Sequence, residues 1–475
     1  MVTFMAMPMP LNAPSLFELR TLTMIEKNVV TMAQLLLHSP DAAQPQPIGW
    51  LSQFGDNLRV SFDKAYVDNP NRLTLSQQYL GASEADTQAI LTAIDDERLV
   101  RIGKLPAFFS NLLPEGHNRE RLAQQRGVSE DDELELLAAA GHDLSGAVEV
   151  IPATDVPDSV LSIHVTKNLE PVEPATVAAP VEDGFSIDGV QTKFSMVHDG
   201  RRYIVRRGRT AGDFIAKLPS TKFRDLVQNE GICMRLAAQV GVKTAKTEVR
   251  PIAELDVPEH VQDEFKEFLL VHRFDRFKRE DGSTGRIHFE ELTQALGLDA
   301  RKKYYEMEAA MVALLSILKS SAAATMDDFD EFFRRWTVNA LMGNTDAHSK
   351  NWGLIYADGR HARLSPAYDL VSVASYFDVV SEKELSINRA ADVKLRQWGE
   401  EQAAALAKAA GYLQFNRARK VVRDTMKMAA AEWPAMLAEA PEGVRKTISG
   451  RLAQMVPQPK AVAAEAPERT VKPRP

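Results

Sequence analysis

The sequence predicts an α+β protein with two lobes, a mixed N-lobe and a mainly helical C-lobe, preceded by a small α+β subdomain. Strand-like segments predominate in residues 185–275, and residues 276–455 become mainly helical after about residue 289. Residues 46–152 mix short strand-like and helix-like segments. A strand-rich block followed by a helical block is typical of two packed lobes, and ligand sites tend to form between such lobes.

The composition is that of an ordinary globular protein and disfavours several classes. The 475 residues are enough for two or three compact domains. The single cysteine, Cys233, excludes an internal disulfide and fits the reducing cytoplasm, which is the location we expect. The formal net charge of −8 disfavours a dedicated nucleic-acid binder. No run of about 18 apolar residues occurs, so we expect no membrane span.

Within the small subdomain, residues 46–152, the pattern alternates between the two types of element. Residues 57–62 are strand-like, whereas residues 107–124 and 130–140 have a helical pattern. We therefore expect a small α+β module in front of the two lobes.

Three further segments are expected to lie outside the compact domains. Residues 1–45 are interpreted as an extension of unclear role that includes a helix over roughly residues 17–37. Residues 153–184 scatter Pro, Val, Ala, Asp and Glu without a helical period and are interpreted as a linker. Residues 456–475 consist largely of Pro, Ala, Lys and Arg, and we expect a disordered tail.

The strand-rich N-lobe has a clear order of elements. Residues 193–197 and 201–205 flank an Asp-Gly pair, which is a strong signal for a β-hairpin. A strand over residues 213–218 then precedes a helix over residues 225–240, whose apolar residues share one face.

The most informative segment for function is residues 326–372. An amphipathic helix, capped by Asp327 or Asp328, is predicted to end at Gly343. A polar loop with Asp346 and Asn351 follows it.

The segment then predicts a hairpin. If Asp358 and Gly359 are the two turn residues, position 351 lies opposite 366, and 348 lies opposite 369. Asp369 would therefore return beside the loop that precedes the hairpin.

Asp346, Asn351 and Asp369 together provide what phosphoryl transfer needs. One carboxylate orients the attacking hydroxyl, while an asparagine oxygen and a second carboxylate hold Mg²⁺ on the phosphates of ATP. The spacing from Asp346 to Asn351 equals that of the protein-kinase catalytic loop. The alternative is a helix–turn–hairpin whose polar loop residues cap backbone groups. His348 could orient Asp346 or be a structural histidine.

A nucleotide site also needs a phosphate-binding loop and a cation. Gly189 permits a close backbone approach to phosphate, although an ordinary turn is equally compatible. Lys217 lies in an apolar strand, as a lysine that binds the α- and β-phosphates would, and Glu230 is its possible ion-pair partner. The alternatives are an edge-strand lysine and a solvated glutamate. Residues 268–274, with His272 and Phe274, could be a hinge that binds adenine, or a buried strand.

At several ordered places the chain resembles the HipA family of serine/threonine kinases, the toxin half of bacterial toxin–antitoxin pairs. The resemblance covers about residues 47–452. Residues 108–116 and 141–147 resemble signatures of the family's N-terminal subdomain. The other matching motifs are Ser186-x-x-Gly189-x-Gln191-x-Lys193 (phosphate loop), residues 214–219 (lysine strand), Asn229-Glu230 (start of the next helix), residues 343–351 (catalytic loop) and residues 368–370 (metal motif).

The resemblance implies a two-lobed, protein-kinase-like fold that binds ATP and Mg²⁺. It also implies that phosphorylation of the serine matching Ser186 ejects the phosphate loop and silences the kinase. The expected roles are Asp346 as the catalytic residue, Asn351 and Asp369 as metal ligands, His348 and Lys350 as supporting residues, and Lys217, Gly189, Gln191, Lys193, Glu230, His272 and Phe274 as nucleotide-binding residues.

The resemblance also implies partners. They are a protein substrate, such as an aminoacyl-tRNA synthetase or another translation factor, and a small helix-turn-helix antitoxin through which operator DNA is contacted indirectly. Asp188 departs from the pattern because a carboxylate inside a phosphate loop repels phosphate.

Two other functions remain open. A small-molecule kinase of the aminoglycoside or choline type also uses Asp-x-x-x-x-Asn, but it usually carries His where this chain has Asn344. A catalytically inactive module that only binds a DNA-binding partner is the second alternative.

Overall fold

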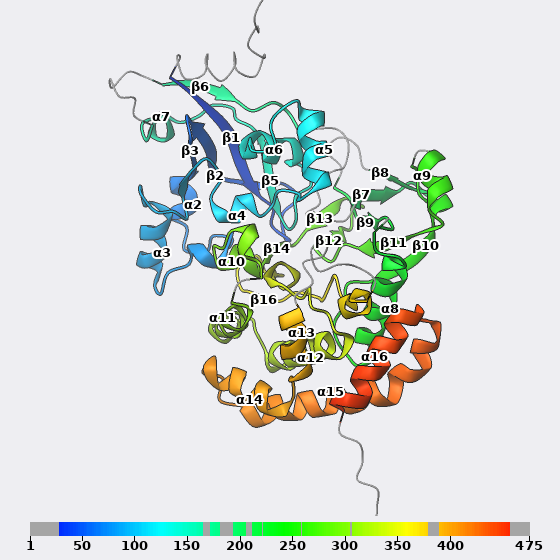
Figure 1. Cartoon of the computed structure of the whole chain (residues 1–475). Helices are drawn as coiled ribbons and strands as arrows, with labels where there is room; N and C mark the ends of the chain where they lie inside the picture. The colour runs from blue at the N-terminus through cyan, green and yellow to red at the C-terminus, as the bar shows by residue number, and fades with distance from the viewer. Residues whose placement is uncertain are drawn as a thin grey trace, which may run out of the picture.

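Figure 1 shows the computed structural model of the chain. It describes residues 28–164, 172–180, 193–205, 211–220, 222–257, 259–304, 306–378 and 389–456. An N-terminal module (blue to cyan) and a second, green sheet lie above a lobe of helices (yellow to red). No helix in these ranges is long and apolar enough to cross a membrane.

The N-terminal module is built on a sheet with the strand order β4-β3-β2-β1-β5, and β6 runs parallel to β1. The neighbours in the main order pair antiparallel. The strands are β1 (Val29–Leu37), β2 (Gln46–Phe54), β3 (Asn57–Phe62), β4 (Val100–Ile102), β5 (Val148–Pro152) and β6 (Glu173–Thr176).

Short helices complete this module, and Leu134, Leu136, Leu137 and Ala139 of α6 are fully buried in its core. The helical segments are α2 (Lys64–Val67), η1 (Gln77–Tyr79), α3 (Glu84–Leu91), α4 (Ala107–Ser110), α5 (His117–Arg126), α6 (Glu133–Ala140) and α7 (Asp158–Leu161).

Three expectations for the N-terminal region are wrong. Residues 29–37 form strand β1 and not the end of a helix, because this apolar segment pairs on both sides and is buried on both faces. The region expected to be a linker contributes α7 and β6. The single helix expected over residues 107–124 is broken into α4 and α5, because Pro114 and the left-handed Gly116 (φ 55°) interrupt it.

The N-lobe is a five-stranded antiparallel sheet with the order β10-β11-β9-β7-β8, and helix α8 packs against β10 and β11. The predicted hairpin, strand and helix are all confirmed, within two residues at each end. The elements are β7 (Lys193–His198), β8 (Tyr203–Val205), β9 (Phe214–Lys217), α8 (Leu226–Gln239), β10 (Thr247–Pro251), η2 (Ile252–Glu254), α9 (Glu259–Glu264) and β11 (Glu267–His272).

Short elements connect this sheet to the helices. Strand β14 pairs with β15 (Gly353–Tyr356), which forms a hairpin with β16 (Arg363–Leu364). This hairpin follows the loop with Asp346 and Asn351 and is called the catalytic hairpin below. Helix α10 packs against α4 of the N-terminal module. The connecting elements are β12 (Arg276–Lys278), β13 (Thr284–Arg286), β14 (His288–Glu291), α10 (Leu292–Ala295) and η3 (Ala300–Lys302).

The C-lobe is mainly helical, as predicted, and α12 runs through its core between α8, α11, α15 and α16. Phe332, Phe333 and Ala340 on its inner face are almost fully buried. The elements are α11 (Met307–Ser320), α12 (Met326–Met342), η4 (Ser349–Asn351), β15 (Gly353–Tyr356), β16 (Arg363–Leu364), η5 (Val373–Tyr376), α13 (Arg389–Arg396), α14 (Glu400–Ala409), α15 (Phe415–Met436), η6 (Leu437–Glu439) and α16 (Glu442–Met455).

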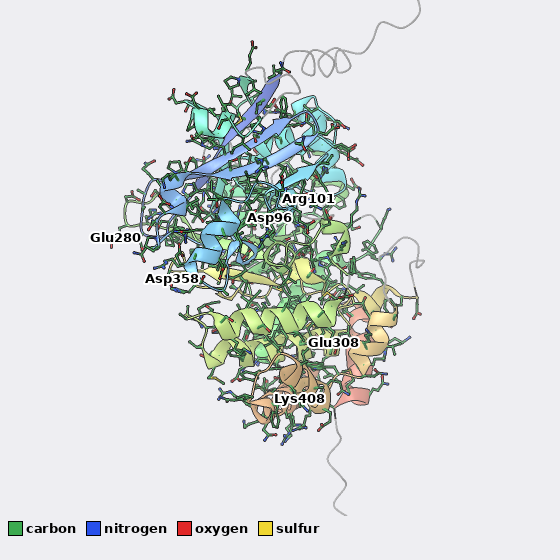
Figure 2. All side chains as sticks on the ribbon, turned by 90° about the vertical axis from the view of Figure 1, so that its left-hand side faces the viewer. Asp96, Arg101, Glu280, Glu308, Asp358 and Lys408 are labelled. Carbon is green, nitrogen blue, oxygen red and sulfur yellow. The ribbon has the colours of Figure 1, made fainter. Side chains whose placement is uncertain are left out.

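The catalytic hairpin also contacts the N-terminal module at its turn. The backbone N–H of Thr74 donates to the carbonyl of Gly359 (2.9 Å), and its hydroxyl donates to the carbonyl of Arg360 (2.8 Å). In Figure 2, Asp358 accordingly lies at the lower edge of the N-terminal module. This contact fixes the far end of the hairpin.

Candidate active site

Side-chain amides of asparagines hold the backbone of the catalytic loop, residues 344–351, in place. Helix α12 ends where predicted, and its C-cap Gly343 adopts a left-handed conformation (φ 68°). Asn344 donates from its amide to Asn339 Oδ1 (2.8 Å), and its own Oδ1 accepts from the backbone N–H of Asp346 (3.2 Å). Asn351 Nδ2 donates to the carbonyl of Asp346 (2.8 Å). The backbone of Asp346 is thus held from two sides.

At its start, α12 differs from the prediction. Its N-cap is Thr325, and Asp328 completes a capping box by accepting from the backbone N–H of Thr325 (2.8 Å). Asp328 therefore caps the helix from its first turn, and Asp327 is not the cap.

The hairpin register also differs by one residue from the prediction. Leu354 lies opposite Leu364 and Ile355 opposite Arg363, because the turn between the strands is wider than two residues. Asp369 nevertheless returns beside the catalytic loop, because the hydroxyl of the preceding residue, Tyr368, donates to the carbonyl of Lys350 (2.9 Å). The charge of Asp369 accordingly contributes to raising the pKa of Asp346. Asp369 itself has a left-handed backbone (φ 54°), which is uncommon outside glycine and clusters at functional sites.

Lys217, Glu230 and Asp369 form one ionic cluster between the two lobes. Lys217 Nζ donates to Glu230 Oε1 (2.6 Å) and to Asp369 Oδ1. The Lys217 and Glu230 side chains are only 6% and 3% exposed, whereas Asp369 is 34% exposed. Burial opposes ionisation of Asp369, but the charge of Lys217 outweighs it and lowers the pKa of Asp369 to about 2. Asp369 is therefore anionic at neutral pH and partly accessible from solvent.

Lys193 adds a second positive charge beside this cluster. It lies directly opposite Lys217 in the β7–β9 ladder, and its charge contributes to lowering the pKa of Asp369. Ser186, Gly189 and Gln191, the other expected residues of the phosphate loop, lie outside the described residues.

Asp346 lies between Tyr304 and His348. Its Oδ1 accepts a hydrogen bond from the Tyr304 hydroxyl, and His348 Nε2 lies 3.9 Å from the same oxygen, too far for a hydrogen bond. Desolvation raises the pKa of Asp346 to about 6, although Tyr304 opposes this shift. The Asp346 side chain remains 43% exposed, so it is accessible from solvent. His348 is buried, its pKa falls to about 3, and it is neutral at pH 7.

Lys350 meets a residue to which the sequence interpretation gave no role. Its Nζ contacts Glu115 Oε1 (2.8 Å), and the other oxygen of Glu115 contacts Lys303 Nζ (2.9 Å). Glu115 belongs to the N-terminal module and lies in the motif of residues 108–116. The motif of residues 108–116 marked this segment in the sequence, but the sequence alone did not show that Glu115 forms ion pairs with Lys303 and Lys350.

The second motif of the N-terminal module contacts the N-lobe through Asp143. Its carboxylate pairs with Arg273 (3.0 Å) and Arg276 (3.2 Å), and it accepts from the Ser195 hydroxyl of β7. All of these side chains are buried. The N-terminal module is therefore tied both to the strand that follows the phosphate loop and to the catalytic loop.

His272 and Phe274 occupy different surroundings. His272 Nε2 contacts Glu248 Oε1 (2.9 Å) on the neighbouring strand β10. Phe274 packs against the ring of Tyr368 (5.8 Å between centroids), one residue before Asp369. Phe274 thus packs on the residue that precedes Asp369, whereas His272 contacts residues of the sheet.

The donor set of this site fits magnesium. Asn351 uses its amide NH₂ on the backbone of Asp346, which leaves its Oδ1 available, and Asp369 gives only Oδ1 to Lys217. Within the described ranges, no group of three His, Cys, Asp or Glu side chains is arranged to hold a metal. Mg²⁺ needs no such cage, because it binds through one or two protein ligands, water and substrate phosphates.

A strand-rich lobe with a buried Lys–Glu pair, followed by a helical lobe with an Asp-x-x-x-x-Asn loop and a second aspartate, defines a protein-kinase-like fold. Two family models match the chain: the HipA-like C-terminal domain at residues 185–433 and the HipA N-terminal domain at residues 42–151. The chain belongs to the HipA family.

Named relatives agree with this assignment. The chain is 31% identical to the putative kinase Y4dM of Sinorhizobium fredii, over 82% of this chain and 90% of that protein. It is 28% identical to the serine/threonine-protein kinase toxin HipA of Shewanella oneidensis, over 60% of this chain and 67% of that protein.

The fold is similar to that of HipA in a solved complex of the Shewanella oneidensis toxin–antitoxin system, which contains HipA, HipB and operator DNA. The TM-score is 0.60 at 21% identity, and the match covers 89% of this chain and 96% of that chain. This likeness concerns the fold, and it includes the N-terminal module as well as both lobes.

Proposed function

We propose that this protein is a serine/threonine protein kinase that transfers the γ-phosphate of ATP, with Mg²⁺, to a protein hydroxyl. The observation that carries the proposal is the convergence of Lys217, Glu230 and Asp369 beside Asp346 and Asn351. These groups come from β9, α8 and the two ends of the catalytic hairpin, so no single secondary-structure element supplies them.

In the proposed reaction each residue has a distinct task. Lys217, with Lys193 beside it, binds phosphate oxygens, and Asn351 and Asp369 hold Mg²⁺, which neutralises charge on the phosphates. Asp346 accepts a hydrogen bond from the acceptor hydroxyl and takes its proton as the bond from oxygen to the γ-phosphorus forms. The bond from that phosphorus to the β,γ-bridging oxygen breaks, and ADP leaves.

The raised pKa of Asp346 supports its proposed task. A carboxylate whose pKa lies near 6 is still ionised at pH 7 and is a stronger base than an ordinary aspartate. Because burial lowers the pKa of neighbouring His348 to about 3, its imidazole is a weaker base than the carboxylate of Asp346.

Incorporation of labelled phosphate tests the proposal. The purified full-length chain with Mg-ATP should label itself or an added protein, and Asp346→Asn should abolish the labelling. The exposed Asp424→Asn is the matched control and should keep full activity. Equal labelling by Asp346→Asn would refute the role of the base. Turnover with a metabolite and no labelled protein would indicate a small-molecule kinase, and no Mg-ATP binding by calorimetry would indicate an inactive module.

We further propose that phosphorylation of Ser186 switches the enzyme off, and that the chain is the toxin of a pair with a small helix-turn-helix antitoxin. Membership of the HipA family and the fold shared with a HipA–HipB–operator complex support this proposal. Ser186→Ala should prevent a progressive loss of activity during incubation with Mg-ATP. A variant that loses activity as fast as the parent protein would contradict the switch.

A further inference from the structure

The segment from Leu298 to Tyr304 lies against the acceptor side of the proposed active site. At its end, Lys303 offers its carbonyl to the backbone N–H (3.1 Å) and the hydroxyl (3.0 Å) of Ser349 in the catalytic loop. The next residue, Tyr304, donates its hydroxyl to Asp346. The segment is therefore bonded to the loop at two neighbouring points, through backbone and side chain.

Tyr304 is held in place by more than this one hydrogen bond. Its ring packs edge-on against His348, with 4.9 Å between centroids and 81° between planes. Lys303 Nζ lies 5.7 Å from the centre of the same ring. A tyrosine with restricted ring motion can restrict the carboxylate that accepts its hydrogen bond.

The two oxygens of Asp346 are consequently not equivalent. Oδ1 accepts from Tyr304, whereas no described residue donates a hydrogen bond to Oδ2. The carboxylate is 43% exposed even though His348 beside it is only 8% exposed. Because the backbone of Asp346 is fixed by Asn344 and Asn351, the Tyr304 bond sets the remaining side-chain rotation. The second oxygen is then free to meet an acceptor hydroxyl.

The N-terminal module holds the start of this segment. Asp299 pairs with Arg101 (2.9 Å) and Lys104 (2.6 Å), and the Asn111 amide donates to the carbonyl of Leu298 (2.8 Å). Figure 2 shows Arg101 on the N-terminal module, above the helical lobe.

Glu115 makes the decisive contact at the end of the segment. One of its oxygens meets Lys303, next to Tyr304, and the other meets Lys350 in the catalytic loop. The two lysine side chains are 16% and 5% exposed, and Glu291 lies 3.5 Å from Lys350 as well. Removing Glu115 would therefore take the shared anion from both lysines in surroundings with little solvent and leave Lys350 with the longer contact to Glu291.

We propose that Tyr304 is a positioning residue that orients Asp346 for the acceptor hydroxyl. Glu115 of the N-terminal module fixes the position of Tyr304, through the neighbouring Lys303, relative to Lys350 in the catalytic loop. The acceptor half of the active site is then completed by a module outside the two kinase lobes. This inference rests on the proposed kinase function and adds a positioning device to it.

Steady-state kinetics of phosphate transfer by the full-length protein, with Mg-ATP and dephosphorylated casein as the added acceptor, tests the inference. Tyr304→Phe keeps the ring but removes the hydroxyl, so kcat should fall on the order of 10-fold to 100-fold. The KM for ATP should change less than about twofold, because Lys217, Asn351 and Asp369 are untouched. Tyr412→Phe is the matched control, since its buried hydroxyl has no hydrogen-bond partner among the described residues, and its kcat should stay unchanged.

Glu115→Gln provides the second variant, and the double variant tests the coupling. If Glu115 acts in part through Tyr304, the double variant should lose less activity than the product of the two single losses. Equal kcat for Tyr304→Phe and Tyr412→Phe, or strictly multiplicative losses, would overturn the inference. If the parent protein is no more active than Asp346→Asn, the proposed function fails and the inference fails with it. An active parent beside an unaffected Tyr304→Phe removes the inference alone.

Discussion

The two halves of the proposed active site are built in different ways. The described charged groups of the nucleotide half, Lys217, Glu230 and Asp369, come from the two lobes, and the N-terminal module reaches this half through the contact of Asp143 with Ser195 on β7. The acceptor half, around Asp346, is supported through Tyr304, Lys303 and Glu115 by the N-terminal module. We therefore expect the module to affect the acceptor half more directly than the nucleotide half.

The largest expected effect concerns the nucleotide half. Lys217→Met removes the buried cation that bonds both carboxylates and leaves Glu230 and Asp369 with the charge of Lys193 alone beside them among the described residues. Phosphate transfer should fall by roughly 10²- to 10³-fold, the usual loss when a transition-state charge contact is removed. Isothermal calorimetry should also show weaker Mg-ATP binding, whereas Tyr304→Phe should leave that binding intact. Lys420→Met, at an exposed ion pair, is the control. Unchanged transfer would show that the nucleotide half is wrongly assigned.

The next effect concerns the link to the acceptor half and depends on pH. Burial opposes ionisation of Glu115, but Lys350 and Lys303 outweigh it and lower its pKa to about 2. Its contribution to stability is therefore fully present above pH 4.5 and is lost as the pH falls from 4.5 towards 2. Glu115→Gln should lower the free energy of unfolding by about 3 kcal/mol at pH 7, because two lysines lose their shared anion.

Denaturant unfolding at several pH values measures this contribution. The difference between the parent protein and Glu115→Gln should shrink as the pH falls below 4.5. Glu401→Gln removes an exposed partner of Arg419 and should leave stability unchanged at every pH. A pH-independent difference for Glu115→Gln would mean that packing, not charge, joins the module to the loop.

The smallest effect concerns the end of α12, from which the catalytic loop starts. An alanine at Gly343 would adopt an unfavourable left-handed conformation, and its Cβ would lie 2.8 Å from the Cβ of Ala374. Gly103→Ala is a matched control with a similar φ (73°) and no atom within 4 Å of the new Cβ. Gly103→Ala should lower the free energy of unfolding by about 1 kcal/mol, because alanine disfavours this backbone conformation. Gly343→Ala should lower it further, because the new Cβ also collides with Ala374. An equal decrease in Tm for the two variants would show that the chain around Gly343 moves to accommodate the new Cβ without further loss of stability.

Much of the fold was predictable from local pattern, and the errors share a cause. The Asp-Gly hairpin, strand β9 and helix α8 were found because their turn residues and apolar periods act over a few neighbours. Residues 29–37 were assigned to a helix because a short apolar run has the same appearance in a helix and in a strand buried on both sides. Its pairing with the next strand, β2, and with β5, which is distant in sequence, decided between them.

The sequence by itself identified the residue types of the candidate site, because their spacing in the catalytic loop and the chemistry of phosphoryl transfer restrict the choice. It also indicated the family through short ordered motifs. Only the tertiary structure brought Lys217 to Asp369 and Glu115 to Lys303 and Lys350. These partners lie 152, 188 and 235 residues apart. At such separations local pattern carries no information on contacts, and packing of the module against both lobes selects the partners.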